Sequence, residues 1–216
     1  MAISTEKFEN IKSKIQQFID EEMIADENSF DLSHKFADHL PFLEEKRNKV
    51  REMGLFTPQI PKNHGGLGLS LYQLGQIYEI LGQTFYGLYV FNCQAPDAGN
   101  MEILMEHGTE YQKENFLNPL VTGKARSCFS MTEPDYAGSN PTMMGTTAIK
   151  DGSNYVINGH KWFTSSADGA DFAIAMVITD PKNPNPYMRA SQIIIPTDTK
   201  GFNFIRNISV MGDEGE

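Results

Sequence analysis

The sequence predicts an α+β fold in which a helical N-terminal domain is followed by an antiparallel β-barrel or β-sandwich domain. Before residue 124, apolar residues recur at helical spacing, and after it short runs rich in β-branched residues replace that spacing. Asp-Gly at 151–152 and Asn-Gly at 158–159 lie between such runs, and both dipeptides accept the positive φ that tight hairpins require. We therefore expect a helical domain over residues 1–124 and a β domain over residues 125–216.

Charge and cysteine content exclude several classes of protein. The 216 residues include 18 Lys and Arg against 28 Asp and Glu, a net charge of −10, which argues against nucleic acid or an anionic membrane as the partner. No apolar run approaches the ~18 residues of a membrane span, and the N-terminus lacks a secretory signal pattern. Cys93 and Cys128 provide no disulfide framework, and the 5 histidines show no metal-ligand spacing. We expect a cytoplasmic protein with no metal site.

Helix-start signals precede the predicted helices. Ser4 or Thr5 can cap a first helix, whose apolar stripe begins at Phe8. Ser70 can cap a helix over residues 71–81 in the same way.

Two prolines are expected to limit helices. Pro41 should start or break a helix within residues 31–53, which Gly54 would end. Residues 109–112, Thr-Glu-Tyr-Gln, form a capping box for a later helix, which we expect to stop before Pro119.

Branched and aromatic runs predict strands in the second half of the chain. Turn residues separate these runs, so each run should form its own strand. The predicted strands cover residues 126–132, 146–150, 155–157, 161–164, 173–179, 192–195 and 201–210.

Two segments of the predicted β domain point to a particular chemistry. Residues 129–139 have the sequence Phe-Ser-Met-Thr-Glu-Pro-Asp-Tyr-Ala-Gly-Ser, and residues 155–165 have the sequence Tyr-Val-Ile-Asn-Gly-His-Lys-Trp-Phe-Thr-Ser. Either segment alone would indicate only strands and turns. In this order and at this spacing, the pair resembles the acyl-CoA dehydrogenase family of flavoproteins.

The resemblance extends over nearly the whole chain. Residues 54–56 and the loop 61–68 resemble a loop of the family's N-terminal domain. Residues 92–97, Asn-Cys-Gln-Ala-Pro-Asp, together with residues 99–102 resemble the branch of family members ten and eleven and their bacterial relatives.

This resemblance implies FAD as the cofactor, held between the helical domain, the β domain and a C-terminal four-helix domain. It implies α,β-dehydrogenation of an acyl-CoA thioester, in which a base removes the α-proton and the β-hydrogen passes as hydride to flavin N5. The alternatives are a related flavoprotein oxidase or monooxygenase of the same fold, or a non-catalytic truncated module that binds a partner.

The first segment would contact the flavin and its phosphates. By resemblance, Phe129 lies beside the ring, while the backbone around Met131 and the hydroxyl of Thr132 donate hydrogen bonds near N1 and O2. Reduced flavin is negatively charged there, so fixed donors stabilise it. Gly138 and Ser139 match the position that serves the flavin pyrophosphate or the pantetheine arm of CoA.

In the second segment, Phe163 falls at the family's ring-packing aromatic position and Ser165 at the hydroxyl that faces N5. Trp162 lies one position before Phe163 in this pattern, and Thr164 lies one position before Ser165. Because neighbouring strand residues face opposite sides, one of Trp162 and Phe163 should lie in the core, and we favour Phe163 as the flavin contact.

Asn92 and Gln94 are open to two interpretations. They either line the acyl pocket, with Ser139 as a further substrate contact, or form a turn and helix cap before Pro96.

The resemblance places the catalytic base beyond Glu216, in the four-helix domain that these 216 residues do not include. No catalytic residue is therefore assigned, and we expect this chain alone to bind FAD weakly or not at all and to be inactive. For the full-length protein, the resemblance implies a role in fatty acid β-oxidation, electron transfer flavoprotein as the acceptor, and a homotetramer or dimer.

Overall fold

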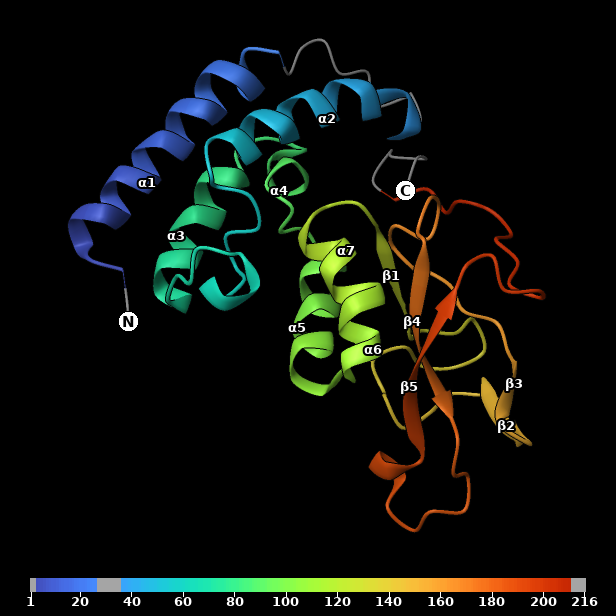
Figure 1. The fold of residues 1–216 in the computed structure, drawn as a ribbon. Helices are drawn as coiled ribbons and strands as arrows, with labels where there is room; N and C mark the ends of the chain where they lie inside the picture. Colours follow the sequence, from blue (N-terminus) through green and yellow to red (C-terminus); the bar gives the residue numbers. More distant parts are fainter. Residues whose placement is uncertain (1–2, 27–35, 211–216) are drawn as a thin grey trace. The chain divides into compact units, whose positions relative to one another are not determined.

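A computed structural model describes residues 3–26 and 36–210 (Figure 1). The chain divides into two compact units, one that runs to Lys124 and a second from Ala125 to Ile208. Helices make up the first unit and a sheet the second, so the predicted α+β class is confirmed.

The first unit is built from helices that alternate with turns. Two π-helical segments continue helices, one of them at the end of the predicted first helix, and a short 3-10 segment lies in a loop. The elements are α1 (Thr5–Phe18), η1 (Ile19–Ile24), α2 (Phe36–Glu52), η3 (Lys62–His64), α3 (Leu71–Leu81), α4 (Gly87–Val90), α5 (Asp97–His107), α6 (Glu110–Gln112), η4 (Lys113–Leu117) and α7 (Asn118–Val121).

One apolar core holds α1, α2, α3 and α4 together. Ile15 of α1, Leu43 of α2 and Leu81 of α3 are fully buried in it. Phe18 meets Phe91 edge to face, with ring centroids 5.5 Å apart, a geometry that aromatic pairs prefer. The apolar stripes of the sequence therefore correspond to the faces that are buried.

The predicted helix caps are confirmed. Ser4, and not Thr5, caps α1, because its Oγ accepts a hydrogen bond from the Lys7 N–H at 3.4 Å. Ser70 and Gln73 form a reciprocal capping box at the start of α3. Thr109 and Gln112 form a second box before α6, so each satisfies a backbone donor that the helix leaves free.

Neither proline ends its helix. Pro41 lies inside α2, where it follows the first turn and removes a single intrahelical hydrogen bond. Pro119 lies at the start of α7, directly after the π-helical segment η4, and the wider turn accommodates a residue without an N–H. The prediction that the helix stops before Pro119 is therefore wrong. Residues 31–35 of the predicted helix lie outside the described residues.

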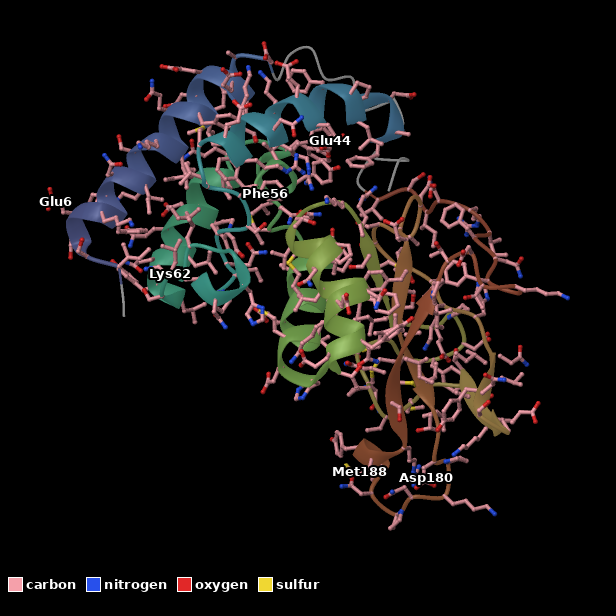
Figure 2. All side chains as sticks on the ribbon, in the orientation of Figure 1. Glu6, Glu44, Phe56, Lys62, Asp180 and Met188 are labelled. Atoms are coloured by element: carbon pink, nitrogen blue, oxygen red, sulfur yellow. The ribbon has the colours of Figure 1, made fainter. Side chains whose placement is uncertain are left out.

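The second unit is a five-stranded sheet centred on β4. Its strands are β1 (Ser127–Ser130), β2 (Thr147–Asp151), β3 (Asn154–Asn158), β4 (Phe172–Ile178) and β5 (Ala190–Pro196). β4 and β5 pair antiparallel along their whole length and lie side by side in Figure 1. The loop that connects them carries Asp180 and the exposed Met188 (Figure 2).

The sheet is mixed and not wholly antiparallel as predicted. β1 pairs parallel with β4, from Ser127 opposite Phe172 to Ser130 opposite Ala175. The chain leaves β1, passes through β2 and β3, and returns to run beside β1 in the same direction. Such a crossover cannot be distinguished from a hairpin by local residue patterns, because both produce the same apolar runs.

The Asp-Gly turn forms the predicted hairpin between β2 and β3, with Gly152 at a φ of 60°. Two other predicted strands are wrong. Residues 161–164 are irregular because Phe163 has a φ of 49°, outside the strand region. Residues 201–210 form no strand ladder, and most of their side chains are exposed, Ile205 at 73%, so little burial stabilises a strand there.

In the described ranges, no helix is long and apolar enough to cross a membrane.

Replacing Ser70 with Ala should lower the free energy of unfolding by about 1 kcal/mol, because the Gln73 N–H at the start of α3 loses its acceptor. Chemical denaturation followed by circular dichroism measures this. Ser13→Ala, on the exposed face of α1, is the matched control and should change stability by less than about 0.5 kcal/mol. Equal effects of the two substitutions would contradict the assigned cap.

Candidate functional site

The two segments singled out in the sequence lie against each other in the second unit. The backbone of Thr132 accepts a hydrogen bond from the Trp162 N–H at 3.1 Å, and the Thr132 hydroxyl donates to the Trp162 carbonyl at 2.7 Å. Residues 30 positions apart are thus joined at the end of β1. A hydroxyl has one proton, so in this arrangement Thr132 can accept a hydrogen bond from a ligand but cannot donate one.

A buried ion pair lies beside this junction. Lys161 donates to Glu133 Oε1 at 2.7 Å and to the Met131 carbonyl at 2.8 Å. The two side chains are only 12% and 4% exposed, respectively. Glu133 also accepts hydrogen bonds from the N–H groups of Gly145 and Thr146, so its carboxylate is satisfied on both oxygens.

These contacts keep Glu133 ionised. Burial alone would raise its pKa, but the hydrogen bonds from Lys161, Thr146 and Gly145 outweigh that effect and lower the pKa to about 2. The carboxylate is consequently a fixed negative charge at neutral pH and not a proton acceptor.

Two aromatic side chains are exposed next to the ion pair. The rings of Trp162 and Phe163 are 4.9 Å apart at an interplanar angle of 60°, and they are 36% and 54% exposed. Neither ring is buried in the core, contrary to the expectation that one of them would be. The reason is the positive φ of Phe163, which breaks the alternation of a strand.

The remaining predicted flavin contacts differ in their exposure and packing. Gly138 approaches Thr132 so closely that an added Cβ would lie 3.0 Å from its methyl group. Ser139 and Ser165 are exposed, and Thr164 is partly buried. Phe129 is partly buried within β1, where it lies opposite Ile174.

This set of residues fits a flavin chemically. A flat, conjugated ring needs apolar faces to pack on and hydrogen-bond donors at its edge. Trp162 and Phe163 supply exposed ring surface, and the Ser165 hydroxyl is accessible nearby in the sequence. The close approach of Gly138 to Thr132 leaves little room for a larger side chain.

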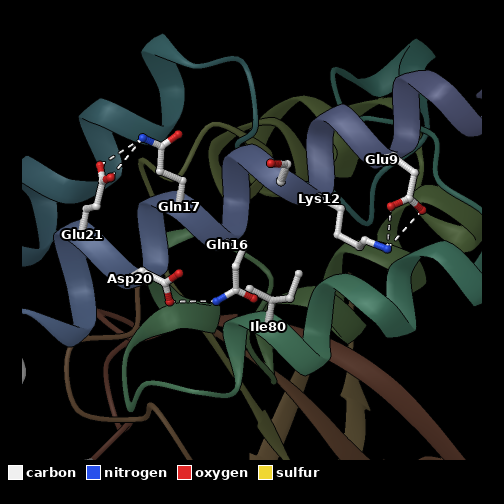
Figure 3. Close-up of a pocket in the computed structure, with 8 residues that line it drawn as sticks. Glu9, Lys12, Gln16, Gln17, Asp20, Glu21 and Ile80 are labelled. Carbon is white, nitrogen blue, oxygen red and sulfur yellow. Dashed lines mark hydrogen bonds and ion pairs between the residues drawn. The ribbon is translucent and has the colours of Figure 1, made fainter.

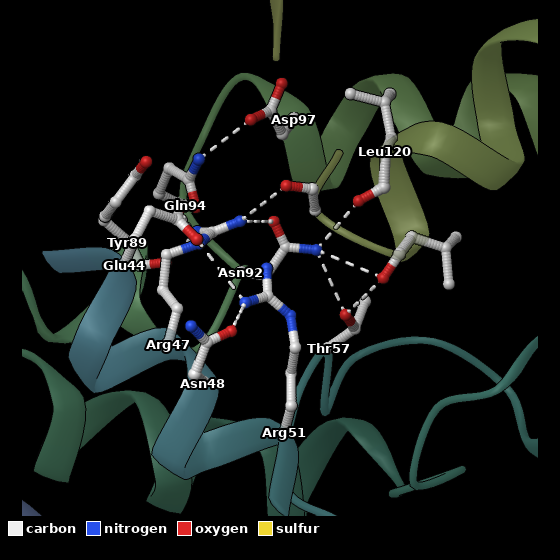
Figure 4. A network of polar contacts seen from close by, with 12 residues as sticks. Glu44, Arg47, Asn48, Arg51, Thr57, Tyr89, Asn92, Gln94, Asp97 and Leu120 are labelled. Atoms are coloured by element: carbon white, nitrogen blue, oxygen red, sulfur yellow. Dashed lines mark hydrogen bonds and ion pairs between the residues drawn. The ribbon is translucent and has the colours of Figure 1, made fainter. Parts of the chain in front are cut away.

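Asn92, a predicted substrate residue, lies in the other unit and is 1% exposed (Figure 4). Its amide donates to Thr57 Oγ1 at 3.0 Å and to the Leu120 carbonyl at 2.9 Å, and its oxygen accepts from Arg47 at 3.3 Å. A φ of 57° suits Asn better than most residues. These contacts correspond to the turn interpretation and use the polar atoms of the side chain internally.

Gln94, the other predicted substrate residue, is partly buried. It donates to Asp97 Oδ2 at 2.8 Å (Figure 4), while its own amide oxygen is buried without a hydrogen-bond partner in the described structure. Of the two residues, Gln94 thus retains an unused acceptor.

Three charged residues were not identified from the sequence as parts of this architecture. Glu133 and Lys161 lie within the two sequence segments, but no local pattern indicates that they pair with each other. Arg47, 2% exposed, donates to the Tyr89 carbonyl at 2.6 Å and stacks on the Tyr89 ring at 4.4 Å. Glu133 and Lys161 are 28 positions apart in the chain, and Arg47 is 42 positions from Tyr89. No local pattern reveals such distant pairing.

An open groove between α1 and α3 is a less suitable site (Figure 3). Its polar side chains already bind one another: Lys12 pairs with Glu9 at 2.8 Å, and Gln16 donates to Asp20 at 2.8 Å. Among the described residues, no cluster of His, Cys, Asp and Glu could hold a metal ion. Cys93 is buried, and burial raises the pKa of its thiol far above the usual range.

Comparison with known proteins matches residues 5–124 to the acyl-CoA dehydrogenase N-terminal domain and residues 128–215 to the acyl-CoA dehydrogenase middle domain. The chain belongs to the acyl-CoA dehydrogenase family. The resemblance seen in the sequence is therefore confirmed.

Relatives include acyl-CoA dehydrogenase family member 11 of Gallus gallus, 38% identical over 95% of this chain and 27% of that protein. Family member 10 of Mus musculus is 35% identical over 93% of this chain and 20% of that protein. The branch named from the sequence is thus confirmed. This chain spans between a fifth and about a quarter of the length of these two relatives.

Solved structures agree with this assignment. One from Mycobacterium abscessus superimposes with a TM-score of 0.89, at 35% identity, over 98% of this chain and 55% of that one. A glutaryl-CoA dehydrogenase from Mycobacterium smegmatis in complex with FADH2 has a TM-score of 0.69 at 24% identity, covering 96% of this chain and 50% of that one. The latter similarity shows the fold alone.

Stability should fall in acid because of Glu133. Its pKa is about 2 in the folded protein against 4.5 ordinarily, so its contribution is complete above pH 4.5 and is lost as the pH falls toward 2. The loss should be roughly 3 kcal/mol, since one pKa unit corresponds to about 1.4 kcal/mol. Urea unfolding at a series of pH values, followed by the fluorescence of the single tryptophan, Trp162, measures it.

Glu133→Gln should show a smaller fall in stability over that pH range than the wild type. Asp135→Asn, which removes a neighbouring exposed carboxylate, is the control and should retain the wild-type fall. If Glu133→Gln and the wild type lost the same free energy between pH 4.5 and 2, the assigned role of Glu133 would be wrong.

Asn92→Ala should destabilise the helical unit by about 2–4 kcal/mol, because it leaves buried hydrogen-bonding groups without partners. The groups affected include Arg47 and the Leu120 carbonyl. Unfolding followed by circular dichroism measures this, with Asn10→Ala on the exposed face of α1 as control. A loss below about 0.5 kcal/mol, the range of ordinary surface substitutions, would contradict the importance of this network.

Proposed function

We propose that this chain is the N-terminal and flavin-binding part of an FAD-dependent acyl-CoA dehydrogenase. The observation that supports this most directly is the junction of Thr132 with Trp162, which brings the two predicted flavin segments together. Family membership supports both the reaction class and FAD as the cofactor.

The proposed flavin contacts would pack on the ring, form hydrogen bonds at its edge, and bind the phosphates. Phe163 and Trp162 would pack on the ring, and Ser165 would donate a hydrogen bond at its edge. Backbone groups near Met131 and Thr132 would serve the pyrimidine side, and Phe129 would lie beside the ring. The turn at Gly138 and Ser139 would serve the pyrophosphate or the pantetheine arm.

When bound, FAD would supply the hydride acceptor for oxidation of an acyl-CoA between its α and β carbons. This chain's own residues would orient the cofactor and exclude water from one ring face. The base that removes the α-proton is proposed to lie in the part of the family relatives that this chain does not span.

The remaining features of the whole enzyme are proposed from the resemblance. Electron transfer flavoprotein would accept the electrons, and the enzyme would assemble as a homo-oligomer and act in fatty acid β-oxidation. A cytoplasmic location is proposed from the cysteine content. Gln94, with its unused amide oxygen, is the better of the two candidates for an acyl-pocket contact.

Phe163→Ala should weaken FAD binding by about threefold to tenfold, because an aromatic packing contact contributes roughly 0.5–1.5 kcal/mol. Titration of the full-length protein, which includes the C-terminal domain, with FAD, followed by quenching of flavin fluorescence, measures the dissociation constant. Phe204→Ala is the matched control, since Phe204 lies in the same unit and is 47% exposed against 54% for Phe163.

The proposal predicts saturable quenching of flavin fluorescence that Phe204→Ala leaves unchanged. Absence of saturable quenching in the wild type would count against a flavin site on this surface. An equal loss of affinity in both phenylalanine variants would show that the rings bind FAD non-specifically.

A further inference from the structure

We propose that the Glu133–Lys161 ion pair is the positioning device that holds the two flavin-contact segments in register. This inference rests on the proposed function, since it assigns the pair a task toward the same site. It concerns residues that do not themselves face a ligand, because both side chains are nearly buried.

Lys161 joins the segments directly. Its Nζ atom donates to the Met131 carbonyl at 2.8 Å and to Glu133 Oε1 at 2.7 Å, and both acceptors belong to the strand-end segment. The next residue, Trp162, bonds to Thr132 through its backbone. Consecutive residues of one segment are thus bound to consecutive residues of the other.

Glu133 adds a third segment to the junction. Its carboxylate accepts the N–H groups of Gly145 and Thr146, which end the loop that begins at Pro134. That loop carries Gly138 and Ser139, the proposed phosphate or pantetheine contacts. The Thr146 carbonyl in turn accepts from the Ile178 N–H at 2.8 Å, so the loop end is tied to β4.

Close packing leaves this arrangement little freedom. An added Cβ at Gly159 would lie 2.1 Å from the Thr146 hydroxyl, so the segment leading to Lys161 passes directly over the loop end. A buried ion pair resists separation because removing either partner leaves an uncompensated charge. The pair therefore restricts the loop and both segments to one relative placement.

The pair is expected to act locally, which distinguishes positioning from general stabilisation. In Glu133→Gln and Lys161→Met, amide hydrogen exchange at Thr146 and Trp162 should accelerate at least about tenfold. Exchange at Ala175 in the centre of β4 should remain at the wild-type rate. Lys161→Arg, which keeps the charge and can donate to both acceptors, should restore slow exchange.

FAD titration of the full-length protein provides the second measurement. Both charge-removing variants should bind FAD about tenfold more weakly, equivalent to about 1.4 kcal/mol, and should alter the visible circular dichroism of bound flavin. Lys161→Arg should recover the wild-type affinity and spectrum. Lys150→Met, which removes an exposed lysine of β2, is the control and should change neither.

The outcomes separate this inference from the proposed function. If the wild type bound no FAD but the variants showed the local exchange pattern, the flavin site would fail and the positioning of the segments would stand. If the variants exchanged like the wild type, or bound FAD with wild-type affinity, the inference would be overturned. Acceleration throughout β4, or failure of both charge-removing variants to fold, would also overturn it in favour of a general structural role.

Discussion

The buried carboxylate of Glu133 is the constraint on which the β unit depends most. It lies at the end of β1, where the chain must leave the sheet, and it binds Lys161 together with the N–H groups of Gly145 and Thr146. A buried charge is tolerated only when it is paired and hydrogen-bonded. The loop and the aromatic segment are consequently placed by the need to satisfy this one group.

The helical unit follows the same principle with the opposite charge. Arg47 is buried in α2, and it donates to the Tyr89 carbonyl and to Asn92 while it stacks on the Tyr89 ring. Asn92 passes the network on to Leu120 and Thr57. In each unit, therefore, irregular segments that regular secondary structure cannot position are held by a buried charged side chain.

This arrangement also holds the exposed aromatic segment, which belongs to no strand, in one place. Phe163 and Trp162 are exposed and belong to no strand, so sheet pairing does not orient them. Their placement follows from the hydrogen bond between the backbones of Trp162 and Thr132, and from the hydrogen bond that the neighbouring Lys161 donates to the Met131 carbonyl. A hydrogen-bonded frame beneath the exposed rings fixes their placement, and a surface that is already ordered loses little conformational freedom when a ligand binds.

The sequence by itself determined the helical first half, the caps at Ser70 and Thr109, the Asp-Gly hairpin and the family, because each depends on residues close together in the chain. Only the tertiary structure decided that β1 runs parallel to β4, that residues 161–164 form no strand, and that Asn92 faces inward. It also paired Glu133 with Lys161. The physical reason is the same throughout: hydrogen bonds and ion pairs between distant segments override local propensity, and their partners leave no periodic trace in a single sequence.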